Sequence, residues 1–406
     1  MPDFARSDSP AVQAQLDRLA QLSPGDDRLG LDRVTRLLER FDRPQDALPP
    51  VFHVAGTNGK GSTCAFLRAA LEASGRTVHM FTSPHLVRFN ERIRIAGKLI
   101  SDDYLAELLA EVLDASDGIE PSFFEVTTAA AFLAFARTPA DAAIIEVGLG
   151  GRLDSTNVFE APLITGIANV GIDHQQFLGT SLVEIAAEKA GIARSGVPLV
   201  MLAQAPEAEA AILRVANERS APVWLEGRDW TLDPTLRSSL LGEHQVRNAN
   251  LAWQMLQQQQ ILPVGRASFQ SGLTLAQWPA RFQELAPGPL VGTAKTWLDG
   301  AHNLEAAEAL AALLADHGPK HLVLGILANK DASGVIAALA PYALSFTFVP
   351  VPDHAHHDPG ELANTFGGKA APSLEDALRE LPEPRLIAGS LYLAGEALRL
   401  NGQLPD

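Results

Sequence analysis

The chain has little of several things that define large classes of proteins, and each shortage excludes one class. It has a single cysteine, Cys64, so it cannot form an internal disulfide, which fits a reducing compartment. Basic residues are few, with 32 Lys and Arg against 48 Asp and Glu and a net charge of −16, and this argues against nonspecific nucleic-acid binding. No apolar run approaches the roughly 18 residues of a membrane span. Asp3 and Asp8 interrupt any signal-peptide pattern. We therefore expect a cytoplasmic protein without nucleic-acid or membrane partners.

Aromatic residues are also scarce, at 6% against a hydrophobic content of 47%, so the core must be rich in Ala, Leu and Val. The 406 residues are too many for a typical single core, and two or three domains are expected. Strand-like runs alternate with helical patterns, which is typical of a mainly parallel sheet covered by helices. Strands are expected at 77–81, 142–147, 163–169, 198–202 and 222–225, and helices at 102–115, 126–137, 182–194 and 207–218.

A break near Ala286-Pro-Gly-Pro289 separates two parts of the chain. After it, an apolar run at 295–299 starts a second alternating series that continues to 385–388. We therefore expect a larger N-terminal domain over 1–288 and a smaller α/β domain over 289–406.

A glycine-rich stretch, Gly56-Thr-Asn-Gly-Lys-Gly-Ser62, follows a short apolar strand pattern at 51–54 and precedes a helical pattern at 64–74. In such a turn, backbone N–H groups and the helix N-terminus converge on phosphate oxygens, and Lys60 adds a positive charge. Gly61 stands where a standard P-loop carries Ser or Thr, so an ordinary turn before a helix is the alternative. The candidate phosphate contacts are Thr57, Asn58, Gly59, Lys60, Gly61 and Ser62.

Three oxygen- or nitrogen-bearing residues follow other predicted strands. Glu146 ends an apolar strand and precedes several glycines, and we favour it as a Mg²⁺ ligand, since Mg²⁺ prefers carboxylate oxygens. Ser83 offers a hydroxyl to a hard cation, but its polar loop is equally compatible with a solvated strand edge. His174 is either a ligand or a structural histidine. No Gly-x-Ser-x-Gly elbow occurs and Cys64 lacks an obvious His partner, so a covalent serine or cysteine mechanism has no support.

Other candidates have weaker patterns. Lys189 lies in an Ala-rich helical pattern and is expected to be a surface lysine. The segment 242–250 opens an amphipathic helix, and a capping role for its Asn248 is favoured over a ligand contact. Asp299 and His302 follow the first strand of the second domain, where ligands bind. The histidines at 354–357 are expected to lie in a solvated loop rather than to bind a metal.

Together the motifs resemble, in order and spacing, the folylpolyglutamate synthase family of the Mur ligase superfamily, which includes bifunctional dihydrofolate synthase/folylpolyglutamate synthase. The match covers nearly the whole chain, and the family also carries Gly directly after the cradle Lys. Besides the cradle, the matching segments are Ser83-Pro-His-Leu86, Glu91-Arg-Ile-Arg94, Phe124-Glu125, Glu146-Val-Gly-Leu-Gly-Gly-Arg-Leu-Asp154, Asp173-His174, Glu188-Lys-Ala-Gly191, Gly242-Glu-His-Gln245, Arg281-Phe-Gln283, Asp299-Gly-Ala-His-Asn303 and Gly389-Ser-Leu-Tyr392.

The resemblance implies an α/β fold with a P-loop-type, mainly parallel sheet flanked by helices, plus a smaller C-terminal α/β domain. It implies an ATP-dependent ligase that joins L-glutamate to dihydropteroate or to folate polyglutamates through an acyl phosphate. ATP and two Mg²⁺ ions would be the cofactors, and a monomer the default state. Residues 1–288 would bind ATP and the pterin, and 289–406 would form the glutamate-ligase domain. Another Mur-type amide ligase and a polyglutamate-only enzyme remain alternatives.

The resemblance also assigns roles to single residues. Lys60, His302 and Lys189, which can be carbamylated, match catalytic positions. The implied Mg²⁺ ligands are Ser83, Glu146 and His174. The further nucleotide contacts are Asn248, Arg281 and Asp299. The implied pterin contacts are Ser122, Phe124, Asp154 and Ser155, with Leu29 and Gly30 in a loop that would close over the same ligand. One departure is Leu304-Glu305, where the family has Pro-His, and it should alter the turn into the following helix.

Overall fold

The computed structural model describes residues 6–22 and 29–406, which leaves Asp3 outside the described residues. The chain divides into two compact units. The smaller unit consists of Leu86–Arg88, Leu240–His244 and Gln277–Asp406, and the larger unit of the rest. The smaller unit thus begins before the predicted boundary at 288–289, because Gln283 and Glu284 already pair with its sheet.

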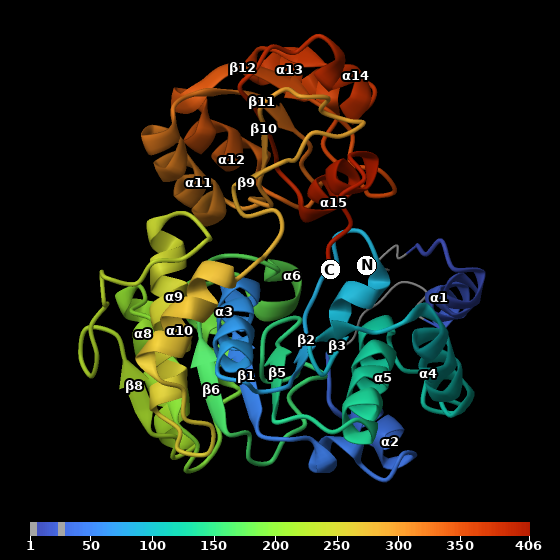
Figure 1. The fold of residues 1–406 in the computed structure, drawn as a ribbon, viewed down its shortest axis with the longest axis vertical. Helices are drawn as coiled ribbons and strands as arrows, with labels where there is room; N and C mark the ends of the chain where they lie inside the picture. Colours follow the sequence, from blue (N-terminus) through green and yellow to red (C-terminus); the bar gives the residue numbers. More distant parts are fainter. Residues whose placement is uncertain (1–5, 23–28) are drawn as a thin grey trace. The chain divides into compact units, whose positions relative to one another are not determined.

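The larger unit is built on an eight-stranded sheet in the order β4-β3-β2-β5-β1-β6-β7-β8 (Figure 1). The six strands from β2 to β8 in that order are parallel, whereas β3 and β4 form an antiparallel edge. The predicted mainly parallel sheet is confirmed. The strands are β1 (Val51–Ala55), β2 (Val78–Phe81), β3 (Ile93–Ile95), β4 (Lys98–Leu99), β5 (Ala142–Glu146), β6 (Ile164–Ile167), β7 (Leu199–Met201) and β8 (Val223–Leu225).

Helices cover this sheet, and several begin where the sequence supplies a cap. Ser122 and Glu125 form a reciprocal capping box at the start of α5, so the helix begins at Phe123 rather than at the predicted 126. The helices are α1 (Pro10–Leu22), α2 (Asp32–Glu39), η1 (Pro44–Ala47), α3 (Lys60–Ala73), η2 (Phe89–Arg92), α4 (Asp102–Asp114), α5 (Phe123–Arg137), α6 (Gln175–Leu178), α7 (Leu182–Ala190), α8 (Pro206–Glu218), α9 (Glu243–Gln257) and α10 (Arg266–Leu275).

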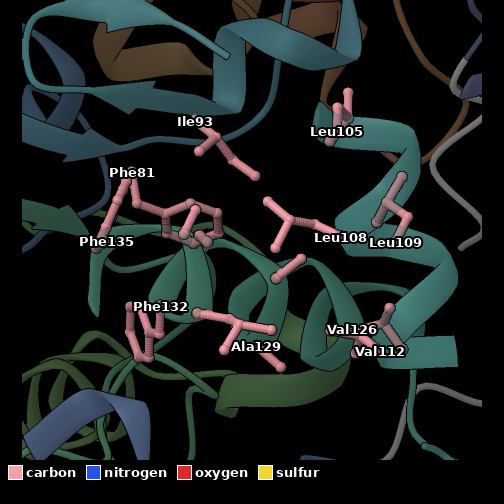
Figure 2. Close-up of a cluster of buried hydrophobic side chains, with 14 of the residues drawn as sticks. Phe81, Ile93, Leu105, Leu108, Leu109, Val112, Val126, Ala129, Phe132 and Phe135 are labelled. Carbon is pink, nitrogen blue, oxygen red and sulfur yellow. The ribbon is translucent and has the colours of Figure 1, made fainter. Parts of the chain in front are cut away.

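One part of the hydrophobic core lies between α4, α5 and the strands β2 and β3. Figure 2 shows Phe81 and Ile93 from the sheet facing Leu108 of α4 and Phe132 of α5, and all four are fully buried. Burying a side chain of this size contributes about 1.5–3 kcal/mol. This core holds β2 and α5 in place, and the candidate residues Ser83 and Phe124 lie just after β2 and within α5.

The helix after the glycine-rich turn, α3, packs on α10. A Cβ at Gly272 of α10 would lie 2.6 Å from the carbonyl oxygen of Ala69 in α3, so the close approach of the two helices requires a glycine there. The packing fixes the axis of α3, and with it the direction of its N-terminus.

The smaller unit contains a six-stranded sheet in the order β13-β12-β11-β14-β10-β9, parallel except for the antiparallel pair β9–β10. Its strands are β9 (Gln283–Glu284), β10 (Thr296–Leu298), β11 (Lys320–Leu324), β12 (Ala343–Phe348), β13 (Lys369–Ala370) and β14 (Arg385–Ala388). Its helices are α11 (Leu304–His317), α12 (Ala332–Leu339), η3 (Ala340–Tyr342), α13 (Pro359–Phe366), α14 (Leu374–Arg379) and α15 (Leu391–Leu400). Without the family's Pro, α11 is capped by the Asn303 side chain, which accepts from Ala306 N at 2.9 Å. Among the described residues, no helix combines the length and apolar character needed to cross a bilayer.

Candidate active site

The glycine-rich turn runs from the end of β1 to the start of α3, as predicted. Gly59, at φ +87°, occupies the N-cap position, and the fourteen residues of α3 begin at Lys60. The turn is tied to the segment after the neighbouring strand β6: Thr57 N donates to the Asn169 carbonyl at 2.7 Å, and Thr57 Oγ1 donates to the Gly171 carbonyl at 3.0 Å. The backbone N–H groups at the start of α3 are therefore held in fixed positions, which suits anion binding.

The Ser62 hydroxyl is buried at the start of α3. Within the described part of the chain, its Oγ atom has no hydrogen-bond partner. A buried hydroxyl normally finds a partner, so this atom fits a ligand oxygen placed at the helix N-terminus.

Asn248 lies against the same turn. A Cβ at Gly59 would be 2.4 Å from Asn248 Oδ1, so the amide occupies the space beside the glycine. The predicted capping role is wrong, because α9 begins at Glu243 and Asn248 lies inside it, only 4% exposed.

Lys189 is buried, 4% exposed, and the expectation of a surface lysine is wrong. Its Nζ donates to the Gly56 carbonyl at 3.0 Å, and Lys60 Nζ donates to the same oxygen at 3.1 Å. The cause of the burial is the packing of α7 on the glycine-rich segment after β5, where a Cβ at Gly151 would lie 2.7 Å from the Lys189 carbonyl oxygen. The structure therefore brings both predicted catalytic lysines of the larger unit together.

Ser83 and Glu146 also meet. Ser83 follows β2 and Glu146 is the last residue of the adjacent parallel strand β5, and Ser83 N donates to Glu146 Oε2 at 3.3 Å. His174 has φ +51° and precedes α6, and its Nε2 lies 4.0 Å from Asp173 Oδ1. Over residues 6–22 and 29–406, no group of three or more His, Cys, Asp or Glu residues has the arrangement of a metal site. Ser83 and Glu146 nonetheless offer the oxygen donors that suit Mg²⁺, which completes its shell with water and phosphate oxygens.

Cys64 is fully buried in α3 near these charges. Burial raises the pKa of its thiol well above the usual value, the Glu146 carboxylate raises it further, and Lys60 opposes the shift. A thiol that stays protonated is a poor nucleophile, which agrees with the predicted absence of a covalent cysteine mechanism.

The predicted pterin residues gather around the segment after β5. The Phe124 ring lies over Gly148, where a Cβ would be 2.3 Å from Phe124 Cζ. Asp154, 2% exposed, accepts from Leu149 N at 2.7 Å, and Ser155 Oγ lies 3.4 Å from Thr128 Oγ1. The remaining members lie on neighbouring elements: Ser122 caps α5, Leu29 packs on the same hydrophobic cluster as Leu149, and Gly30 follows Leu29.

Two residues in this region were not predicted. His53, in β1, and Thr156 form a buried hydrogen-bonded chain with Asp154. The available signal for His53 was a histidine inside an otherwise apolar strand pattern, whereas Thr156 gave no signal beyond its place after Asp154-Ser155.

In the smaller unit, Asp299 organises the turn that carries Arg281. Its carboxylate accepts from Phe282 N and from Ala301 N, both at 2.8 Å. Ala280 and Phe282 both have positive φ, +58° and +47°, so the backbone on either side of Arg281 is strained. Burial raises the pKa of Asp299, and the nearby Arg281 charge opposes this.

Two histidines lie near this turn. His302 Nδ1 donates to the Gly300 carbonyl at 2.8 Å, which fixes the orientation of its ring. Sequence reasoning missed His244: burial and the Arg281 charge lower its pKa to about 4, so it is neutral beside the guanidinium.

The histidines at 354, 356 and 357 lie within the described residues, and they do not form a group that could hold a metal ion. The predicted solvated loop is only partly correct, because the His354 ring stacks on Tyr392 with ring centroids 3.7 Å apart.

Comparison with known proteins assigns the family. The dihydrofolate synthase/folylpolyglutamate synthase of Bacillus subtilis is 38% identical over 360 residues, which cover 81% of this chain and 80% of that protein. The chain belongs to the dihydrofolate synthase/folylpolyglutamate synthase family. No protein-family model matches it.

Solved structures of the family extend the match to nearly the full length. Escherichia coli FolC in complex with DHPP and ADP has a TM-score of 0.87 and 29% identity, and the alignment covers 97% of this chain and 98% of that one. A bifunctional folylpolyglutamate synthase/dihydrofolate synthase with Mn, AMPPNP and L-glutamate bound has a TM-score of 0.85 and 29% identity, with the same coverage of 97% and 98%.

These matches confirm the predicted family, the α/β fold and the enzyme class, an ATP-dependent ligase of folate metabolism that uses a divalent metal. They also confirm small-molecule substrates. The cytoplasmic location, the monomeric state and the absence of nucleic-acid or membrane partners stay predictions.

Proposed function

We propose that this enzyme ligates L-glutamate to dihydropteroate, and to folates with one or more glutamates, through an acyl phosphate. A carboxylate oxygen of the pterin substrate attacks the γ-phosphorus of ATP, and the bond from that phosphorus to the β-phosphate oxygen breaks, releasing ADP. The amine of glutamate then attacks the acyl carbon, loses a proton, and displaces inorganic phosphate. This order requires no enzyme nucleophile, in agreement with the buried, protonated Cys64.

One observation carries the proposal: the P-loop before α3 and the Ser83–Glu146 pair both lie at the carboxyl ends of strands that are close neighbours, β1, β5 and β2. Phosphoryl transfer depends on neutralising charge and on aligning the attacking and leaving oxygens. Lys60 and the α3 N-terminus supply positive charge to the phosphates, and the buried Ser62 hydroxyl adds a donor.

Ser83 and Glu146, with His174, would hold the divalent cation, which supplies further positive charge to the phosphates. Asn248 would contact the nucleotide beside Gly59. Arg281 and Asp299 would be further nucleotide contacts, and His302 would be a catalytic residue. Phe124, Ser122, Asp154 and Ser155 would bind the pterin, with Leu29 and Gly30 at its edge. In this proposal residues 1–288 contain the P-loop and the pterin residues, and residues 289–406 form the glutamate-ligase domain.

The distinguishing experiment measures phosphate release from ATP in three reactions, with dihydropteroate plus glutamate, with tetrahydrofolate plus glutamate, and with glutamate alone. We expect glutamate-dependent release with both pterins. Release with tetrahydrofolate alone would restrict the enzyme to chain elongation. If phosphate release does not depend on either pterin, the proposal is overturned and the substrate is that of another amide ligase.

A further inference from the structure

A buried chain of hydrogen bonds connects β1 to the segment after β5. His53 Nε2 lies 2.9 Å from Thr156 Oγ1, and Thr156 Oγ1 lies 2.5 Å from Asp154 Oδ1. Asp154 Oδ2 accepts from Leu149 N at 2.7 Å. The three linked side chains belong to residues that are 1%, 0% and 2% exposed, so water does not compete for these bonds.

The direction of each bond follows from its donors. The Thr156 hydroxyl donates its single hydrogen to Asp154 Oδ1; burial raises the pKa of this carboxyl group, and the hydrogen bond from Thr156 opposes the shift. The Thr156 oxygen can then only accept from His53, whose Nε2 must carry a hydrogen. Burial, helped by the charge of Arg194, lowers the pKa of His53 to about 3, so the ring stays neutral in this tautomer. Thr156 N adds a second bond to Asp154 Oδ1, at 2.9 Å.

The series of hydrogen bonds ends at the Asp154 carboxylate, close to the face of the Phe124 ring. Leu149, the donor to Asp154, follows Gly148, and the Phe124 ring lies in the space that a Cβ at Gly148 would fill. A pterin has a flat ring with an amino group and ring N–H on one edge. Such a ligand suits an aromatic face beside a fixed acceptor.

We propose that Thr156 and His53 are positioning residues for the pterin: they hold the Asp154 carboxylate in the orientation that accepts the pterin's N–H edge, without touching the substrate. The inference rests on the proposed pterin site. It differs from a role in ATP binding, because the chain contacts none of the P-loop residues through its described hydrogen bonds.

The test uses a matched pair at one position. Thr156→Val keeps the shape of the side chain but removes the hydroxyl, whereas Thr156→Ser keeps the hydroxyl. The dissociation constant for dihydropteroate is measured by pterin fluorescence without ATP or glutamate, and KM for ATP is measured in the full reaction. We expect Thr156→Val to weaken dihydropteroate binding about tenfold, as for loss of one hydrogen bond to a charged group. Thr156→Ser should stay within about twofold of wild type, and KM for ATP should not change in either.

A second variant covers the case in which Thr156→Val does not fold, as judged by thermal unfolding. His53→Phe keeps a ring in β1 and removes the donor to Thr156, and we expect dihydropteroate to bind about threefold more weakly. Equal weakening in Thr156→Val and Thr156→Ser, or an equal rise in KM for ATP, would overturn the positioning role. Normal binding by folded Thr156→Val would overturn it too, while leaving the proposed function intact. A wild-type enzyme that binds neither dihydropteroate nor tetrahydrofolate would overturn both.

Discussion

The ammonium groups of Lys60 and Lys189 share one acceptor, the carbonyl oxygen of Gly56, at 3.1 and 3.0 Å. Lys60 also donates to the Thr57 carbonyl at 3.3 Å, so its side chain folds back over its own loop. Two positive charges on one buried oxygen repel each other, and the arrangement is relieved when either charge is removed or meets an anion. ATP phosphates supply such anions to Lys60.

Replacing Lys60 with Ala should reduce turnover roughly 100- to 1000-fold, the usual cost of removing a preorganised charge-stabilising donor. The folded structure should persist, because the Lys60 side chain is only half-buried. The measurement is glutamate-dependent ADP formation, with circular dichroism as the control for folding. Turnover close to wild type would refute the assigned role of the P-loop.

Carbamylation of Lys189 would turn its positive charge into a negative one next to Lys60. The neutral amine takes up carbon dioxide and loses a proton, which removes the repulsion at Gly56. We expect turnover to fall in buffer depleted of carbon dioxide and to recover with added bicarbonate. Lys189→Met should lose activity and no longer respond to bicarbonate. If bicarbonate does not change the turnover of the wild-type enzyme, Lys189 acts as an unmodified lysine and the carbamylation is refuted.

A methyl group at Gly148 should displace the Phe124 ring, because the new Cβ would lie 2.3 Å from Cζ. Overpacking of this kind typically costs about 1–3 kcal/mol. Gly148→Ala should therefore raise KM for dihydropteroate about tenfold and leave KM for ATP unchanged. The matched control is Gly265→Ala, where nothing lies within 4 Å of the new Cβ. A similar change in both variants would show that Phe124 is not the cause.

Gln283 should matter to ATP binding through the strained turn at Arg281. Its Oε1 accepts from Ala280 N at 3.1 Å, and Ala280 has positive φ. Gln283→Leu leaves this buried N–H without its acceptor, and we expect KM for ATP to rise about threefold to tenfold. The control is Gln403→Leu, elsewhere in the smaller unit, which removes the 3.1 Å bond from Ala286 N together with a 2.6 Å bond from Asn401 Nδ2. An equal rise in KM for ATP in both variants would show that the two glutamines contribute only to the stability of the fold.

The neutral, buried His53 should make the larger unit sensitive to acid. Its pKa is about 3 in the folded chain against an ordinary 6.5, so between these values the unfolded chain binds a proton that the folded chain does not. The neutral His53 ring therefore stabilises the folded chain above pH 6.5. Below that pH the free energy of unfolding falls by up to about 1.4 kcal/mol for each pH unit. Between pH 7 and pH 5, wild type should lose about 2 kcal/mol more unfolding free energy in urea than His53→Gln. An equal loss in both proteins would contradict the assigned state of His53.

Much of the fold and the centre of the site could be predicted because their patterns are contiguous. The strand, glycine-rich turn and helix around Lys60 occupy one short stretch, and each part constrains its neighbours. Glu146 was predictable for a related reason, since the carboxyl end of a buried parallel strand is where ligands bind.

The errors concern side chains whose surroundings come from distant parts of the chain. Lys189 lies in a helix with ordinary amphipathic composition, and its burial depends on the glycines after β5. Asn248 lies beside Gly59, although the two residues are 189 positions apart in the sequence. The bond from His53 to Thr156 joins residues 103 positions apart, and nothing local in either segment indicates the other.

The smaller unit is assembled from Leu86–Arg88, Leu240–His244 and its long C-terminal stretch. It is therefore not a detachable module. A chain shortened to end at Ala276 would keep two segments whose packing partners are gone, among them His244 and Val87, which packs against a cluster of the smaller unit.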